Sequence, residues 1–149
     1  MECRNLWKTY ESGMTAVKDV SLQIKEGDIK LIFGPSGSGK STFLRCLAML
    51  TMPDKGDIFL REECLTKPGV NLNKARARIG FVFQHIYLFR HLTTLGNVEL
   101  ALRRVLKMPR DEARQRALEA LKEVKVEEWA NQYPAQLSSE IGRSHHSTP

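Results

Sequence analysis

The chain has 149 residues, with 23 basic and 17 acidic side chains and a net charge of +6. This length predicts one domain with room for a sizeable core. No apolar run approaches the roughly 20 residues of a membrane span, and the first residues lack a signal-peptide pattern, so we expect a soluble, intracellular protein. The three cysteines are widely spaced without a C-x-x-C pair, which predicts neither a disulfide framework nor a zinc site.

The positive charge permits an anionic partner but does not select one. Its densest group lies between residues 103 and 116, where acidic residues are interleaved and no aromatic residues alternate with the charges. A solvated helix face explains this group better than a surface that stacks bases. We therefore expect no nucleic acid partner.

Short β-like runs occupy the first part of the chain, separated by Gly, Pro, Asp and Lys turn signals. They lie at residues 3–6, 16–24, 29–33, 58–60 and 79–83. One predicted helix, from Lys40 to about Leu50, interrupts them.

The pattern becomes helical after His91. Residues 94–107 place an apolar stripe on one face of a predicted helix, made of Leu95, Val98, Ala101, Leu102 and Val105. Pro109 opens a second predicted helix. A short third helix is expected at 127–132.

This change of pattern predicts three segments. Residues 1–91 form a β-rich nucleotide-binding core, 92–138 a helical subdomain, and 139–149 an aberrant tail.

The segment between the run at 29–33 and the first helix reads G-P-S-G-S-G-K-S-T, which matches the phosphate-loop pattern G-x-x-x-x-G-K-[ST]. Its glycines let successive backbone N–H groups converge on one anion at a helix N-terminus. Lys40 extends a positive charge to the β and γ phosphates, and the Ser41 hydroxyl is placed to ligate a bridging Mg²⁺ ion. The predicted contacts to ATP are Gly34, Pro35, Ser36, Gly37, Ser38, Gly39, Lys40, Ser41 and Thr42.

Two further segments resemble the ATP-binding-cassette family. Residues 79–84 read I-G-F-V-F-Q, similar to the family's glutamine loop, and residues 5–10 read N-L-W-K-T-Y, similar to its first strand and adenine-stacking aromatic. The resemblance implies that Gln84 and Ser41 contact magnesium, that Gln84 senses the attacking water, and that Tyr10 stacks on adenine. Taken alone, Gln84 would be an ordinary strand-end residue and Tyr10 a core aromatic.

The resemblance covers residues 2–138. It implies an α/β fold, namely the phosphate-loop NTPase core of an ABC nucleotide-binding domain with a helical subdomain. The stretch L-R-R-V-L-K at 102–107, followed by Pro109 and Arg110, is similar to importers of polar amino acids. Such a subunit binds ATP and Mg²⁺, pairs with a second cassette, and docks on membrane permease subunits at the cytoplasmic face of the cell membrane.

The match breaks after Ser138. The family expects Gly-Gly-Gln next, whereas this chain has Ser139, Glu140 and Ile141, which add side chains and a negative charge where a phosphate approaches. No later strand ends in Asp-Glu, and His145 and His146 lie in a polar tail, so Walker B, the catalytic Glu and the switch His are missing. We therefore expect ATP binding with little or no turnover, and the abrupt change indicates a reading-frame shift.

The resemblance also implies that the C-terminal strands of the central parallel sheet are absent. Apolar strand edges would then be unpaired, which predicts low stability or aggregation. Three alternatives stay open: a small phosphate-loop kinase, a non-catalytic fragment that binds a permease or partner subunit, and a DNA-associated cassette. The two histidines that follow Gln84, His85 and His91, are interpreted as surface residues.

Overall fold

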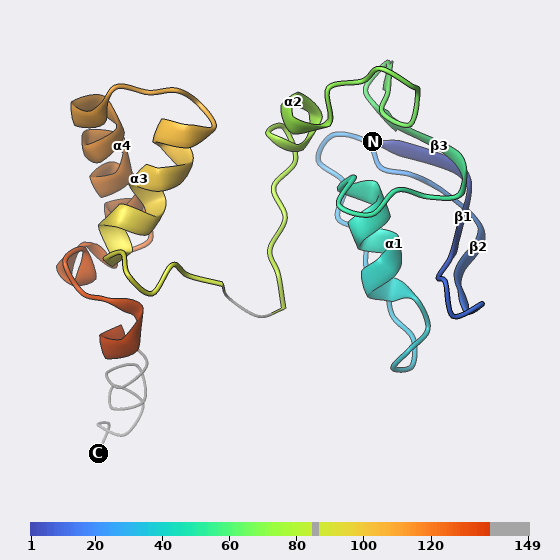
Figure 1. Ribbon diagram of the computed structural model, residues 1–149, viewed down its shortest axis with the longest axis horizontal. Helices are drawn as coiled ribbons and strands as arrows, with labels where there is room; N and C mark the ends of the chain where they lie inside the picture. Colours follow the sequence, from blue (N-terminus) through green and yellow to red (C-terminus); the bar gives the residue numbers. More distant parts are fainter. Residues whose placement is uncertain (85–86, 138–149) are drawn as a thin grey trace. The chain divides into compact units, whose positions relative to one another are not determined.

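The computed structural model describes residues 1–84 and 87–137 of the chain (Figure 1). The chain divides into two compact units, Met1–Phe81 and Val82–Pro149, and each is described by itself. Among the described residues, no helix is long and apolar enough to cross a membrane.

The first unit is built on an antiparallel sheet with the strand order β2-β1-β3-β4. The strands are β1 (Glu2–Thr9), β2 (Thr15–Gln23), β3 (Lys55–Leu60) and β4 (Glu63–Cys64). The predicted runs at 3–6, 16–24 and 58–60 are therefore confirmed as strands. Their register places Cys3 opposite Leu22 of β2 and Ile58 of β3, so apolar side chains meet on one face.

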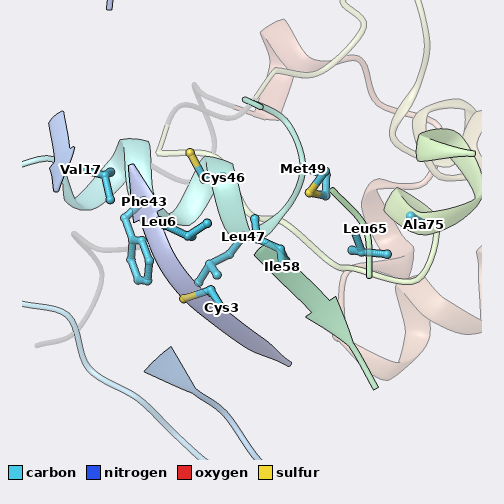
Figure 2. Packing of buried hydrophobic residues seen from close by; sticks show 10 residues of the cluster. All are labelled: Cys3, Leu6, Val17, Phe43, Cys46, Leu47, Met49, Ile58, Leu65 and Ala75. Atoms are coloured by element: carbon cyan, nitrogen blue, oxygen red, sulfur yellow. The ribbon is translucent and has the colours of Figure 1, made fainter. Parts of the chain in front are cut away.

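Helix α1 (Lys40–Leu47) covers that face of the sheet. Figure 2 shows the buried side chains that form this core, which are Cys3, Leu6, Val17, Phe43, Cys46, Leu47, Met49, Ile58, Leu65 and Ala75. Burial raises the pKa of the Cys3 and Cys46 thiols. These cysteines therefore act as small apolar core residues, as free thiols rather than disulfide partners.

Helix α2 (Leu72–Arg76) closes the end of this core. The Asn71 side chain caps its start by accepting a hydrogen bond of 3.0 Å from the Lys74 N–H. The Arg76 guanidinium donates two hydrogen bonds, of 2.7 and 3.0 Å, to the Met49 carbonyl oxygen just after α1. This contact ties the two helices of the unit together.

The prediction of a strand at 29–33 is wrong in this structure, because the segment is not part of a sheet. Ile29, Leu31 and Phe33 are 96, 83 and 86% exposed, whereas Ile32 packs against the core. Three of the four apolar side chains of this segment therefore face solvent. The strand predicted at 79–83 is not formed either, although Ile79 contacts the same core.

The second unit contains two helices side by side, α3 (Thr94–Arg104) and α4 (Arg110–Glu123), followed by the 3₁₀ turn η1 (Glu127–Trp129) (Figure 1). All three lie where the sequence predicts helices. Helix α3 and the turn η1 end a few residues before the predicted ends, and α4 begins just after Pro109. Their core consists of Leu95, Ala117, Leu121 and Ala130. Backbone hydrogen bonds from Thr94 to Gln132 and from Leu95 to Ala130, of 2.8 and 2.9 Å, return the chain after η1 to the start of α3.

Candidate nucleotide site

The phosphate loop runs from the segment at 29–33 into the first turn of α1. Pro35 to Gly39 form turns and bends, and the helix begins at Lys40. Gly39 is the N-cap residue with a φ of +85°, and Gly37 has a φ of +79°. This left-handed backbone favours glycine and directs the loop around the N-terminal end of the helix.

Gly39 also packs directly against β2. A Cβ atom at this position would lie 1.9 Å from the carbonyl oxygen of Ala16, which no real side chain tolerates. A residue other than glycine would therefore force the phosphate loop away from the strand. The sequence motif explains Gly39 by backbone freedom, and the structure adds close contact between two backbones as a second reason.

The Lys40 ammonium lies over its own loop. It donates hydrogen bonds to the carbonyl oxygens of Gly34 and Pro35, at 2.9 and 2.6 Å, and to the Ser38 hydroxyl at 3.3 Å. Its three donors are thus all directed at the loop. An anion between the loop and the helix would meet a positive charge already held at that place.

The next two hydroxyl groups differ in their surroundings. Ser41 is exposed, whereas Thr42 is buried and is 9% exposed. The Thr42 hydroxyl lies 3.0 Å from the Tyr10 hydroxyl. The structure therefore brings Tyr10, predicted from the sequence as the base-stacking residue, into contact with the first turn of α1.

Tyr10 occupies the hairpin between β1 and β2. Its N–H donates to the Met14 carbonyl oxygen at 2.9 Å, and its own carbonyl accepts from the Gly13 N–H at 2.8 Å. One residue earlier, the Thr9 N–H donates to the Asp54 carboxylate at 2.6 Å, and Lys8 donates to the same carboxylate at 2.8 Å. These bonds fix the backbone on both sides of the tyrosine.

The charge pair beside Tyr10 perturbs both of its members. The hydrogen bond from Lys8, followed by the one from the Thr9 N–H, holds the pKa of the Asp54 carboxyl below its ordinary value. The same bond raises the pKa of Lys8. Both groups are therefore charged at neutral pH, and the pair anchors the end of β1 to the start of β3.

The other predicted site residues make fewer described contacts with the loop and α1, or lie outside the described residues. Pro35 and Ser36 are exposed at the tip of the loop. Gln84 is exposed and belongs to the second unit, so its role at the magnesium ion stays a prediction. His91 is exposed as expected. His85, Ser138, Ser139, Glu140, Ile141 and the tail histidines lie outside the described residues.

A groove of about 670 Å³ adjoins the loop. Its walls are mostly β2, residues 31–33 and Phe43, and the loop contributes Gly34, Pro35 and Ser38 to Lys40 at one end. Neither Tyr10 nor Ser41 lines it. The groove is therefore a largely apolar space beside the phosphate loop, and Tyr10 is not part of its wall.

The donor set suits a nucleotide with magnesium. Within the described part of the chain, no group of three His, Cys, Asp or Glu side chains could hold a metal ion. Magnesium at such sites takes few protein ligands and the oxygens of substrate phosphates. An exposed Ser41 hydroxyl next to a lysine and a left-handed glycine fits that requirement, so these residues fit ATP and Mg²⁺.

Sequence reasoning missed three contacts of this site. They are the close approach of Gly39 to Ala16, the hydrogen bond between Tyr10 and Thr42, and the hydrogen bond from the Thr9 N–H to the Asp54 carboxylate beside Tyr10. Each contact joins residues far apart along the chain and depends on how the hairpin packs. A local sequence pattern therefore cannot predict it.

The sequence model of a family described as "ABC transporter" matches residues 17–141. The chain is 44% identical over 122 residues to the arginine transport ATP-binding protein ArtM of Bacillus subtilis (strain 168), an alignment that covers 82% of this chain and 51% of ArtM. It is 42% identical over 138 residues to the general L-amino acid transport ATP-binding protein AapP of Rhizobium johnstonii, covering 93% of this chain and 53% of AapP. The chain thus spans about half the length of the curated relatives it matches.

A solved structure agrees with these sequence matches. A dimeric ATP-binding cassette in a post-hydrolysis state, bound to ADP and Pi, superposes with a TM-score of 0.80 and 41% identity. The match covers 91% of this chain and 62% of the solved one.

Proposed function

Because this chain belongs to the ABC transporter family, we propose that its phosphate loop binds Mg²⁺ and ATP. The observation that carries the proposal is the position of Lys40, whose ammonium is held over the loop at the start of α1. Lys40 would contact the β and γ phosphates, and the loop N–H groups would surround the same oxygens. The Tyr10 ring would stack on adenine.

Magnesium, when bound, would neutralise part of the negative charge on the β and γ phosphates. The exposed Ser41 hydroxyl would ligate it. The magnesium contact of Gln84, which the family resemblance implies, stays a prediction. The solved relative that contains ADP and Pi supports the choice of nucleotide.

For the whole protein we propose a part in amino acid import. The relatives named above are ATP-binding proteins of arginine and general L-amino acid transport. A chain with this role would associate with membrane permease subunits at the cytoplasmic face of the membrane and would pair with a second cassette, as the dimeric relative does. Copurification of the tagged chain with amino acid permease subunits would support this assignment, and recovery without any permease would contradict it.

The chain itself should hydrolyse ATP slowly or not at all. Its sequence contains no apolar strand ending in Asp-Glu, the place from which a general base would come. We expect phosphate release by the purified chain to stay at background in Mg·ATP. Phosphate release abolished by Lys40→Ala would contradict this part of the proposal.

Titration with adenosine, AMP, ADP and ATP tests the binding proposal. Since the loop holds the outer phosphates, affinity should rise from AMP to ADP to ATP, and adenosine should bind weakest. Each charge-assisted hydrogen bond contributes about 1.5–3 kcal/mol, so ATP should bind at least tenfold more tightly than AMP. Equal affinity for AMP and ATP would overturn the assignment of the loop.

A further inference from the structure

The hairpin that bears Tyr10 is docked on the phosphate loop at two points. The first is the contact between Gly39 and the Ala16 carbonyl oxygen, where a Cβ on Gly39 would lie 1.9 Å away. The second is the 3.0 Å hydrogen bond between the hydroxyls of Tyr10 and Thr42. Because there are two separate contacts, they fix both the distance between the hairpin and the phosphate loop and the orientation of one relative to the other.

Thr42 is suited to hold the tyrosine. It is the one buried polar residue among the described side chains. A buried hydroxyl without a partner would cost free energy, so the bond to Tyr10 satisfies a group that water does not reach freely. Thr42 also lies in the first turn of a helix whose start is set by Gly39, so its position is tied to that of the loop.

Tyr10 is held equally firmly from its own side. The turn from Tyr10 to Met14 is closed by hydrogen bonds of 2.9 and 2.8 Å, and the Asp54 carboxylate binds the preceding N–H at 2.6 Å. The backbone of the hairpin is thus fixed, and the side-chain torsions remain to be set. A hydrogen bond at the tip of the ring sets them.

We propose that Thr42 is a positioning residue for Tyr10: its hydroxyl orients the aromatic ring relative to the phosphate loop, so that base and phosphates of one nucleotide are bound together. This inference rests on the proposed binding of ATP. It predicts that base recognition and phosphate binding are coupled through one hydrogen bond. Removing the Tyr10 hydroxyl while keeping the ring should therefore weaken binding of ATP.

The test compares Mg·ATP with Mg·tripolyphosphate, which presents phosphates without a base, by calorimetric titration of the full chain. Tyr10→Phe should weaken binding of ATP about fivefold, the effect of one neutral hydrogen bond. Its affinity for tripolyphosphate should stay within about twofold of wild type, which also reports that the loop is folded. Tyr133→Phe, a tyrosine of the second unit, is the matched control and should bind ATP like wild type.

Variants of the partner residue complete a double-mutant cycle. Thr42→Val should weaken binding of ATP, Thr42→Ser should restore it, and the Tyr10→Phe and Thr42→Val double variant should bind no more weakly than the weaker single variant. Additive losses, or ATP binding by Tyr10→Phe equal to wild type, would overturn this inference while the proposed function stands. Failure of the wild-type chain to bind either ligand would overturn both.

Discussion

Two features favour glycine at position 39, namely the left-handed backbone and the close contact with Ala16. Their effects on stability can be measured separately. The Gly39 φ of +85° costs an alanine about 1–2 kcal/mol, and the Ala16 carbonyl oxygen leaves no space for a Cβ. Gly39→Ala should therefore lower the free energy of unfolding by more than about 2 kcal/mol. Gly13 has a φ of +80° with nothing within 4 Å, so Gly13→Ala is the matched control for backbone strain alone. Urea denaturation measures the free energy of unfolding of both variants. Equal losses of stability would show that the contact with Ala16 adds nothing to the cost of the substitution.

The Asp54 carboxylate contributes to the pH dependence of the free energy of unfolding. Its pKa is lowered in the folded chain by Lys8 and the Thr9 N–H, so its contribution is present above the unfolded pKa and is lost as pH falls through the folded pKa. Between pH 7 and pH 3, the free energy of unfolding should therefore fall less in Asp54→Asn than in wild type. Glu62→Gln, at an exposed turn residue, is the control and should follow wild type. An unchanged acid profile in Asp54→Asn would contradict the described ion pair.

At the scale of elements, α4 is held by a narrow apolar stripe. Leu121 is 5% exposed in the core with Leu95, whereas Leu118 on the same helix is 39% exposed. Leu121→Ala should destabilise the second unit by about 2–5 kcal/mol, and Leu118→Ala should have a much smaller effect. Amide hydrogen exchange of α3 and α4 measures the difference. Similar exchange in the two variants would show that this helix pair is not packed as described.

Local patterns predicted the strands β1, β2 and β3 and the helices α1, α3 and α4, but they did not predict β4 or α2. The helices of the second unit follow from apolar spacing and from Thr93, whose side chain accepts the Gly96 N–H at 3.1 Å. The strands of the hairpin follow from alternation. The run at 29–33 has the same local preference, yet it is not in a sheet, because a strand also needs a neighbour that supplies hydrogen bonds. Local preference cannot tell whether such a neighbour exists.

The candidate site likewise has a part that local sequence predicts and a part that depends on tertiary packing. The phosphate-loop motif could be recognised from the sequence, since it consists of consecutive residues from Gly34 to Thr42. The partner of Thr42 could not, because Tyr10 reaches it through the packing of a hairpin. Tyr10 itself was identified only by resemblance to a family, and the structure adds the contact that ties it to the loop.

On the scale of the whole molecule, the exposed apolar face at 29–33 predicts association. Ile29, Leu31 and Phe33 are exposed, and exposed apolar patches promote association between chains. The triple change of these residues to Ser should reduce light scattering of the concentrated chain and should leave its core intact. Val105→Ser, at another exposed apolar residue, is the control with little effect. Unchanged scattering in the triple variant would mean that this face does not drive association.

The role proposed for Lys40 is to hold the outer phosphates of ATP at the phosphate loop. Calorimetric titration of the full chain with Mg·ATP tests it most directly, with Lys67→Ala, a lysine exposed in a turn of the same unit, as the control for charge. We expect saturable binding by wild type and Lys67→Ala, and a loss of affinity of at least tenfold in Lys40→Ala, the scale of one charge-assisted contact. Binding of ATP by Lys40→Ala with wild-type affinity would contradict it.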